Sequence, residues 1–353
     1  MYKPLPSLAP LLYVPSLLFG AVVRLRNLSY SRGALRSARL PRPVISIGNL
    51  TLGGTGKTPL VIHLAATLLR LGHQTAILSR GFGRHRIAIS HVLQPRGDGP
   101  LHTSHLGDEA ALIRRRLPEA WLGISTDRFA VGRKIAGLSP GVVFVLDDGF
   151  QHRQLHRDLD IVVIDPTQPL GENHLFPLGS LREPVSGLRR CHAVVLNGGA
   201  PAAVMASIAS TLADINAHAR IFHCTQKIDL LVPFGAWIDS TFAPTVAGRC
   251  ARSFLTAALG NPRRFRADVE NLGTTVTGCR FFRDHHILTR QEWRDCVRQA
   301  DRAGAEAIII TEKDAVKIVE PPDFPLLVAL QSVRFDRPAE FEQMLTKVIQ
   351  GIP

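Results

Sequence analysis

Short runs of Val, Ile and Leu without polar alternation recur along the first two hundred residues. They lie at 44–47, 75–78, 142–146, 161–164 and 193–196, a spacing that leaves room for helices between them. Continuous apolar strands of this kind are typical of a sheet that is buried on both faces. The pattern therefore predicts an α/β fold with a mostly parallel sheet and helices on both of its faces.

The first of these runs leads into a glycine-rich turn and then an amphipathic helix that begins near Lys57. Such a turn lets backbone N–H groups surround a phosphate, while the lysine reaches the β- and γ-phosphates and the following hydroxyl contacts Mg²⁺. The strict pattern has Gly where this chain has Thr51, so we interpret the stretch as a variant P-loop. The alternative is a glycine-rich turn with an incidental Lys-Thr. The predicted nucleotide-binding residues are Thr51, Leu52, Gly53, Gly54, Thr55, Gly56, Lys57 and Thr58.

An apolar run that ends in acidic residues follows about ninety residues later, at 141–148. A strand ending in Asp is the Walker B pattern, in which the carboxylate holds Mg²⁺ opposite the P-loop hydroxyl. The pattern is weak alone and becomes informative beside a P-loop. It predicts ATP and Mg²⁺ as cofactors, with Thr58 and Asp147 as the metal ligands. Asp148 would serve the metal shell or cap the turn.

The alternation of apolar runs and predicted helices is interrupted between about residues 221 and 249 and then resumes. Apolar runs return at 253–259, 274–282 and 307–310, and a capping box, Thr289 with Glu292, opens a helix between them. We therefore expect a second, smaller α/β domain. The predicted organisation is an apolar and basic segment over 1–30, a P-loop nucleotide-binding domain over 31–222, and the smaller domain with its linker over 223–353.

The N-terminal segment is the most apolar stretch near either end of the chain. Leu8–Val23 is short for a membrane span and contains Pro10 and Pro15, and basic residues follow it rather than precede it. A signal peptide has the reverse order of charge. The arrangement favours a helix in the interface of an anionic membrane, and the alternative is a helix of the core.

Composition narrows the classes of partner. The chain of 353 residues has 42 Lys and Arg against 29 Asp and Glu, a net charge of +13, which favours an anionic partner. Aromatic residues make up 6%, which disfavours the stacking mode of single-strand nucleic-acid binding. The 5 cysteines are widely spaced, without a Cys-x-x-Cys pair, as in a protein with free thiols and no zinc site.

The P-loop and Walker B motifs do not say what is done with the nucleotide, but phosphoryl transfer needs a group that orients or deprotonates the nucleophile. Candidates are Asp108, His152 and His285, and an Asp–His pair could share the work. From its position at a predicted helix start, Asp108 could equally be an N-cap. The guanine-selecting Asn-Lys-x-Asp motif is absent, so ATP is favoured over GTP.

The motifs in their order along the chain resemble those of the tetraacyldisaccharide 4′-kinase family, the lipid A 4′-kinases. The series covers about residues 44–318 and comprises 48–59, 79–84, 107–109, 147–152, 181–183, 260–262, 284–285 and Thr311–Lys317. The resemblance implies transfer of the ATP γ-phosphate to the 4′-hydroxyl of a tetraacylated glucosamine disaccharide 1-phosphate, which gives lipid IVA. It places the enzyme on the cytoplasmic face of the inner membrane of a Gram-negative bacterium, with no nucleic-acid partner.

The same resemblance assigns roles to individual residues. It implies Asp108 and His285 as the catalytic pair, contributed by different domains, and therefore predicts closure of the cleft between them. Contacts to nucleotide or lipid head group would fall on Arg80, Arg128 and Glu183, with Asp148 as a further candidate. The family often has Tyr where this chain has Phe82, so a hydrogen bond from that ring is lost while stacking would remain.

Two other functions compete with this interpretation. A switch or partitioning-type ATPase would share the Gly-Gly-Thr-Gly-Lys-Thr core, but Leu52 stands where its signature lysine is expected. A nucleic-acid-associated ATPase would need a basic surface distributed for a duplex, whereas much of the charge here lies beside the apolar N-terminus.

Overall fold

A mixed sheet of 12 strands runs through the described part of this computed structural model, which covers residues 9–84, 89–97, 103–167, 170, 174–239 and 250–351. The strands follow the order β10-β9-β11-β12-β8-β7-β6-β1-β5-β2-β4-β3. All neighbours are parallel except β12 with β8 and β3 with β4. The predicted mostly parallel α/β fold is confirmed.

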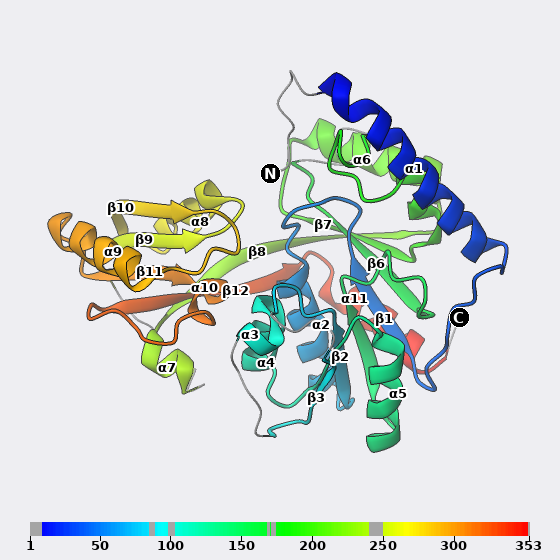
Figure 1. The fold of residues 1–353 in the computed structure, drawn as a ribbon, viewed down its shortest axis with the longest axis horizontal. Helices are drawn as coiled ribbons and strands as arrows, with labels where there is room; N and C mark the ends of the chain where they lie inside the picture. Colours follow the sequence, from blue (N-terminus) through cyan, green and yellow to red (C-terminus); the bar gives the residue numbers. More distant parts are fainter. Residues whose placement is uncertain are drawn as a thin grey trace.

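The sheet extends through two lobes (Figure 1). The larger, which we call the P-loop lobe, contains β1 (Val44–Gly48), β2 (Thr75–Ser79), β3 (His91–Leu93), β4 (Trp121–Ile124), β5 (Val143–Asp147), β6 (Leu159–Ile164) and β7 (Ala193–Asn197). Its helices are α1 (Ala9–Ser31), α2 (Lys57–Arg70), α3 (Thr103–Leu106), α4 (Asp108–Arg116), α5 (Arg128–Leu138), the 3₁₀ helix η3 (Val185–Arg190), α6 (Ala202–Ile215) and α11 (Pro338–Ile349).

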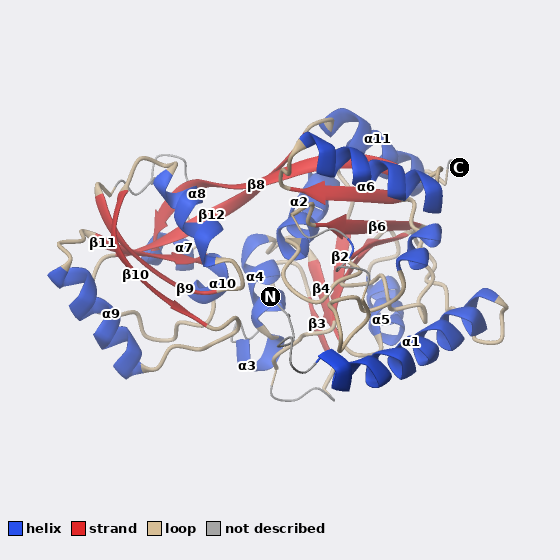
Figure 2. Cartoon of the chain, turned by 90° about the horizontal axis from the view of Figure 1, so that it is seen from above, coloured by secondary structure: helices blue, strands red, loops and turns tan. Residues whose placement is uncertain are grey.

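The small lobe holds β9 (Arg252–Ala258), β10 (Thr275–Phe282) and β11 (Ala307–Thr311), with α7 (Phe234–Ile238), α8 (Pro262–Glu270), α9 (Arg290–Arg302) and α10 (Glu312–Ala315). Two long strands, β8 (Arg220–Pro233) and β12 (Leu326–Phe335), pair antiparallel and run from one lobe into the other (Figures 1 and 2). The chain therefore crosses between the lobes on paired strands, and α11 returns to the P-loop lobe.

Both faces of the sheet are covered by helices, as the unbroken apolar runs predict. In β1, Ile45 and Ile47 face a core that includes α2, α4 and α11, whereas Val44 faces the core built with α5. In β11 the alternation repeats, with Ile309 in the core beneath α8 and Ile308 in the core beneath α9. Because successive strand residues point to opposite faces, two buried faces require apolar residues at every position.

The sequence suggests that the alternation of strands and helices is interrupted after residue 221. In the structure, residues 220–233 instead form one long strand, β8. Its buried positions alternate, with Phe222, Cys224, Gln226 and Ile228 facing inward. Short apolar runs with polar residues between them are the pattern of a strand with one exposed face. Residues 240–249 of the predicted junction lie outside the described residues, and the predicted domain boundaries stay predictions.

The predicted apolar N-terminal segment forms α1, with Pro15 in its second turn. By length and composition alone, Pro10–Ser31 could cross a bilayer; it is the only helix with these properties in the portion of the chain that the structure describes. Buried core helices and signal sequences meet the same criteria, but only 11% of its apolar window is buried here. Large apolar side chains therefore line its outer surface, among them Leu11, Leu18, Val22 and Leu25.

Candidate active site

The P-loop closes around Gly56, the residue that precedes α2. Gly56 has a φ of 78°, and its carbonyl oxygen accepts a hydrogen bond from Gln226 Nε2 at 2.7 Å. Asn197 Nδ2 donates to the neighbouring Thr55 carbonyl oxygen at 2.8 Å. A Cβ at position 56 would overlap both amide groups, and the left-handed φ disfavours any side chain, so the turn requires glycine here.

The start of the loop is held by a second segment of backbone. Thr51 forms an antiparallel bridge with Leu181, and the Leu52 N–H donates to the Ser180 carbonyl oxygen at 2.6 Å. The hydroxyl of Thr55 is buried and has no hydrogen-bond partner among the described residues. The hydroxyl is therefore available to a ligand or a water molecule.

Asp147, the last residue of β5, lies beside the P-loop strand because β5 and β1 are neighbours in the sheet. Ser79 donates to its Oδ2 at 3.0 Å, while its Oδ1 is buried without a partner among the described residues. Burial, with Glu109 and Asp148 nearby, raises the pKa of Asp147 to about 7. An orphaned carboxylate oxygen in a negative environment fits a site for a cation.

The described residues contain no group of three His, Cys, Asp or Glu that could hold a metal by themselves. Mg²⁺ is usually bound by one or two carboxylates together with phosphate oxygens and water. Thr58, in the first turn of α2, and Asp147 fit that incomplete donor set.

Asp148 does not cap its turn but carries the ion pairs of the loop. Its carboxylate lies 2.7 Å from Arg182 NH1 and 3.5 Å from Lys57 Nζ, and its φ is 48°. Burial raises the pKa of Asp148, but the two cations and the hydrogen bond from Arg182 outweigh it and lower the pKa to about 2. The carboxylate is therefore ionised and holds the P-loop lysine at the end of β5.

Asp108 and His285 lie in contact across the two lobes, 177 residues apart in the sequence. His285 Nδ1 is 3.2 Å from Asp108 Oδ2. Gly107 is the N-cap of α4, so Asp108 is the first helical residue and the N-cap alternative is excluded. His285 has a φ of 66°, a left-handed conformation that is uncommon for residues with a side chain.

The neighbouring His286 has a different environment. Its ring stacks on Phe282, with centroids 5.1 Å apart, and its Nε2 contacts Glu292 at 3.0 Å. Phe82, from the loop after β2, packs edge-on against the His285 ring with centroids 5.5 Å apart. The contact of the phenyl ring with the histidine is therefore present without the hydroxyl that tyrosine would add.

The other residues predicted to contact substrate lie in different environments. Arg80 is exposed at the carboxyl end of β2. Arg128 is buried and donates to the Asp147 carbonyl oxygen at 3.0 Å. Glu183 is 1% exposed and accepts hydrogen bonds from Arg190, Gln151 and, from α1, Asn27. In this conformation Arg128 and Glu183 therefore brace the loop that follows β5.

His152, the third candidate base, lies at the end of that loop. Burial, together with Arg128, Arg157 and Arg26, lowers its pKa to about 3. It is therefore neutral at physiological pH and is surrounded by arginines rather than by a carboxylate partner.

Several residues without a predicted role complete the site. Asn197 and Gln226 hold the P-loop carbonyls, Arg182 pairs with Asp148, and Lys313 and Lys317 contact the Asp108–His285 pair. A buried glutamine in the apolar alternation of β8 was one available signal. The charged motif Thr311–Lys317 was another.

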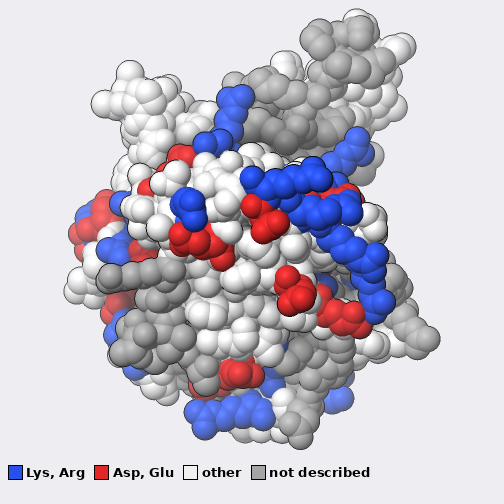
Figure 3. Space-filling model, turned by 90° about the vertical axis from the view of Figure 1, so that its left-hand side faces the viewer, with Lys and Arg blue, Asp and Glu red and all other residues white. Residues whose placement is uncertain are grey.

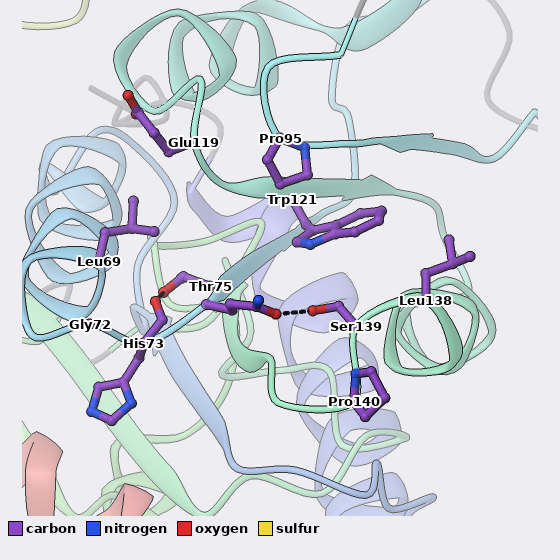
Figure 4. Close-up of a pocket in the computed structure, with 11 residues that line it drawn as sticks. Leu69, Gly72, His73, Thr75, Pro95, Glu119, Trp121, Leu138, Ser139 and Pro140 are labelled. Carbon is purple, nitrogen blue, oxygen red and sulfur yellow. Dashed lines mark hydrogen bonds between the residues drawn. The ribbon is translucent and has the colours of Figure 1, made fainter.

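A cavity of about 550 Å³ lies at the opposite edge of the sheet from this site. It is lined by Thr75 and Trp121, the first residues of β2 and β4, and by the ends of α2 and α5; Figure 4 shows Trp121 above Ser139, whose hydroxyl donates to Gln74. The P-loop and Asp147 lie at the carboxyl ends of β1 and β5, which run parallel to β2 and β4 in the same sheet. The cavity therefore takes no part in the chemistry.

Comparisons with known proteins agree with this geometry. Residues 8–350 match the family model of the tetraacyldisaccharide-1-P 4′-kinases. The tetraacyldisaccharide 4′-kinase of Geobacter sulfurreducens is 35% identical over 348 residues, covering 97% of this chain and 94% of the relative. That of Anaeromyxobacter sp. (strain Fw109-5) is 38% identical over 316 residues, covering 88% of this chain and 82% of the relative.

A solved structure is similar over its whole length. The crystal structure of LpxK from Aquifex aeolicus in complex with ATP has a TM-score of 0.72 and 27% identity, covering 97% of this chain and 98% of that one. These matches confirm the P-loop fold and the kinase function in lipid A biosynthesis that the motif series predicts. The chain belongs to the tetraacyldisaccharide-1-P 4′-kinase family.

Proposed function

We propose that this chain transfers the γ-phosphate of Mg²⁺-bound ATP to the 4′-hydroxyl of a tetraacylated glucosamine disaccharide 1-phosphate. The acceptor oxygen forms a bond to the γ-phosphorus, the bond from that phosphorus to the β,γ-bridging oxygen breaks, and the hydroxyl proton passes to the enzyme. The products are ADP and the 4′-phosphorylated lipid. The observation that carries the proposal is the Asp108–His285 contact between the lobes, 3.2 Å long.

The nucleotide would lie along Thr51–Thr58, with Lys57 and the N–H groups at the start of α2 directed at its phosphates. The ATP complex of the Aquifex relative supports ATP as the donor. When bound by Thr58 and Asp147, Mg²⁺ would neutralise charge on the β- and γ-phosphates. Arg80, Arg128, Asp148 and Glu183 remain predicted contacts to nucleotide or lipid head group.

His285 would be the general base and Asp108 its partner. A carboxylate only accepts hydrogen bonds, so the neutral ring donates its Nδ1–H to Asp108 and presents the Nε2 lone pair. Nε2 would take the proton of the 4′-hydroxyl as the new bond forms. Asp108 would then stabilise the imidazolium, as the buried carboxylate does in hydrolase triads.

The inner membrane is the proposed location, with α1 lying on or in its cytoplasmic leaflet. The exposed apolar side chains of α1 and the basic residues Arg24, Arg26, Arg32 and Arg36 support contact with anionic lipid. A substrate with four acyl chains stays in the bilayer, so an enzyme docked there meets it directly. On the face that Figure 3 shows, a run of basic side chains is bordered by acidic ones.

The proposal is tested by following phosphate transfer from ATP to acylated disaccharide 1-phosphate in detergent micelles. We expect product from the wild type, and a loss of kcat of at least about 10²-fold in Asp108→Asn and in His285→Gln, the range typical of acid–base groups. His286→Gln is the matched control because its ring contacts Glu292 instead. Absence of product from the wild type, or near-normal turnover in both dyad variants, would contradict the proposal.

A further inference from the structure

The motif Thr311–Lys317 directs two lysines toward the Asp108–His285 pair. Thr311 caps α10, and Lys313 and Lys317 extend from this short segment toward His285 and Asp108. No step proposed above uses either lysine. Lys313 lies on the His285 side of the catalytic pair and Lys317 on the Asp108 side.

Lys313 lies at the nitrogen that is needed as the base. Its Nζ is 3.2 Å from His285 Nε2 and 2.7 Å from Asp284 Oδ1. An ammonium group only donates hydrogen bonds, so it can pair with Nε2 only while that nitrogen has no proton. The contact therefore selects the free-base ring that donates Nδ1–H to Asp108.

Asp284 favours the other form of the His285 ring, in which both nitrogens are protonated. Its Oδ2 lies 4.0 Å from His285 Nε2, so the imidazole is placed between two carboxylates, Asp108 at one nitrogen and Asp284 at the other. Two carboxylates favour a ring protonated at both nitrogens, and such a ring cannot accept a proton from a hydroxyl. Lys313 forms an ion pair with Asp284 and so offsets its charge. Burial raises the pKa of Asp284, but the hydrogen bond and the charge of Lys313 outweigh this effect, so that the pKa is lowered.

Lys317 acts on the other side of the pair. It is buried, lies 3.7 Å from Asp108 Oδ2 and 3.1 Å from Asp314 Oδ1, and donates to the His286 carbonyl oxygen at 3.2 Å. The ammonium group of Lys317 therefore places a cation beside the carboxylate oxygen that accepts Nδ1–H. Around the ring the charges are therefore Asp108, Asp284 and Asp314 against Lys313 and Lys317.

We propose that Lys313 is a positioning residue that keeps His285 Nε2 unprotonated by occupying it and by neutralising Asp284. The acceptor hydroxyl then replaces the ammonium group at Nε2, while Lys313 keeps its ion pair with Asp284. The inference rests on the proposed function of His285 as the base. It gives the Thr311–Lys317 motif a role in the protonation state of the catalytic ring.

The kinetic test uses the same micelle assay with a double-mutant cycle. Lys313→Met is expected to lower kcat by about 10–100-fold with little change in KM for ATP, and Lys313→Arg to keep most of the activity. Asp284→Asn alone has a small effect. In the double variant Lys313→Met/Asp284→Asn, kcat recovers to within about fivefold of the wild type, because the competing carboxylate is gone. Exposed Lys347→Met on α11 is the matched control.

The ring itself gives a second measurement. In protein labelled with ¹⁵N-histidine, the His285 signals, identified among 14 histidines by their loss in His285→Gln, report which ring nitrogens carry protons. The wild type is expected to show a protonated Nδ1 and a free Nε2. Lys313→Met shifts the ring toward protonation at both nitrogens at the same pH, and Asp284→Asn reverses the shift.

The outcomes separate the inference from the function beneath it. If His285→Gln is as active as the wild type, the proposed base is wrong. If His285→Gln is inactive but Lys313→Met leaves the ring and kcat unchanged, the role of Lys313 is overturned. A loss of kcat in Lys313→Met that Asp284→Asn does not restore would also overturn it, because a merely structural lysine is not rescued by removing an acid.

Discussion

Gly56 is the residue at which the P-loop leaves least room for a side chain. Its left-handed φ costs a residue with a side chain about 1–2 kcal/mol, and a Cβ would overlap the Asn197 and Gln226 amides that hold the loop. We expect Gly56→Ala to weaken ATP binding by at least about tenfold, since 1.4 kcal/mol corresponds to that factor. Titration with a fluorescent ATP analogue measures the effect.

Gly137 provides a matched control for Gly56. Gly137 in α5 has open space around its Cβ position, so Gly137→Ala should leave nucleotide affinity unchanged and stabilise the helix slightly. If Gly56→Ala bound the nucleotide as tightly as Gly137→Ala, the loop would not depend on the two amides.

Residue types and their order identified much of the candidate site, but not its contacts. Spacing from a strand was enough to predict roles for Lys57 and Asp147, because the carboxyl ends of neighbouring parallel strands meet. From position alone, Asp108 was equally an N-cap and His285 was one of three candidates; the resemblance of the motif series singled out the two as a pair. Only the fold places the two side chains 3.2 Å apart and brings Lys313 to the ring, since no local pattern encodes a pairing across 177 residues.

Among the helices, α9 shows most directly how sequence sets an element. Thr289 and Glu292 form the predicted capping box, and Glu292 also contacts His286. The backbone N–H of Thr289 and the His286 ring lower the pKa of Glu292 from 4.5 to about 2. Because the folded pKa lies below the unfolded value, the charged carboxylate stabilises the fold above about pH 4.5, and this contribution is lost as the pH falls toward 2.

Glu292→Gln keeps an acceptor for the Thr289 N–H but removes the charge near the helix N-terminus, so it should destabilise the protein near neutral pH by about 0.3–1 kcal/mol. The difference from the wild type should shrink when urea unfolding is repeated at pH 3.5. Glu320→Gln is the control, since Glu320 pairs with Arg290 at the exposed surface, where ion pairs contribute little. A difference that stayed constant with pH would show that the charge of Glu292 does not stabilise the helix.

Elements with a single clear period were predicted and those with mixed patterns were not. The apolar strands β1, β2, β5, β6 and β7 follow the unbroken runs of the sequence. By contrast, β8 alternates buried and more exposed residues between Phe222 and Asp229, where one of its faces is exposed, and the alternation ends at Leu231 and Val232, which are both buried. Its length depends on pairing with β12, about a hundred residues later, which local sequence does not specify.

At the scale of the molecule, α4 connects the two lobes through side-chain contacts, in addition to the paired strands β8 and β12. Its first residue, Asp108, contacts His285, and near its last turn Arg116 NH1 pairs with Glu312 of α10 at 2.8 and 2.9 Å. Arg115 lies over the Trp237 ring, 5.0 Å from its centroid. The small lobe therefore holds α4 at both ends, and the position of Asp108 depends on contacts seven and eight residues away.

Breaking the Arg116–Glu312 pair should consequently affect both stability and catalysis. Glu312→Gln keeps an acceptor for the Gln331 N–H and removes the charge, so we expect a loss of about 1–3 kcal/mol in the free energy of unfolding and a fall in kcat with unchanged KM for ATP. Arg116→Gln should give a similar result, and the double variant less than the sum of the two because both remove one interaction. Glu342→Gln, which breaks a more exposed pair with Arg70 within the P-loop lobe, should change neither quantity much. If stability fell while kcat held, α4 would keep Asp108 in place without the small lobe, and the alignment of the catalytic pair would have to come from β8 and β12 alone.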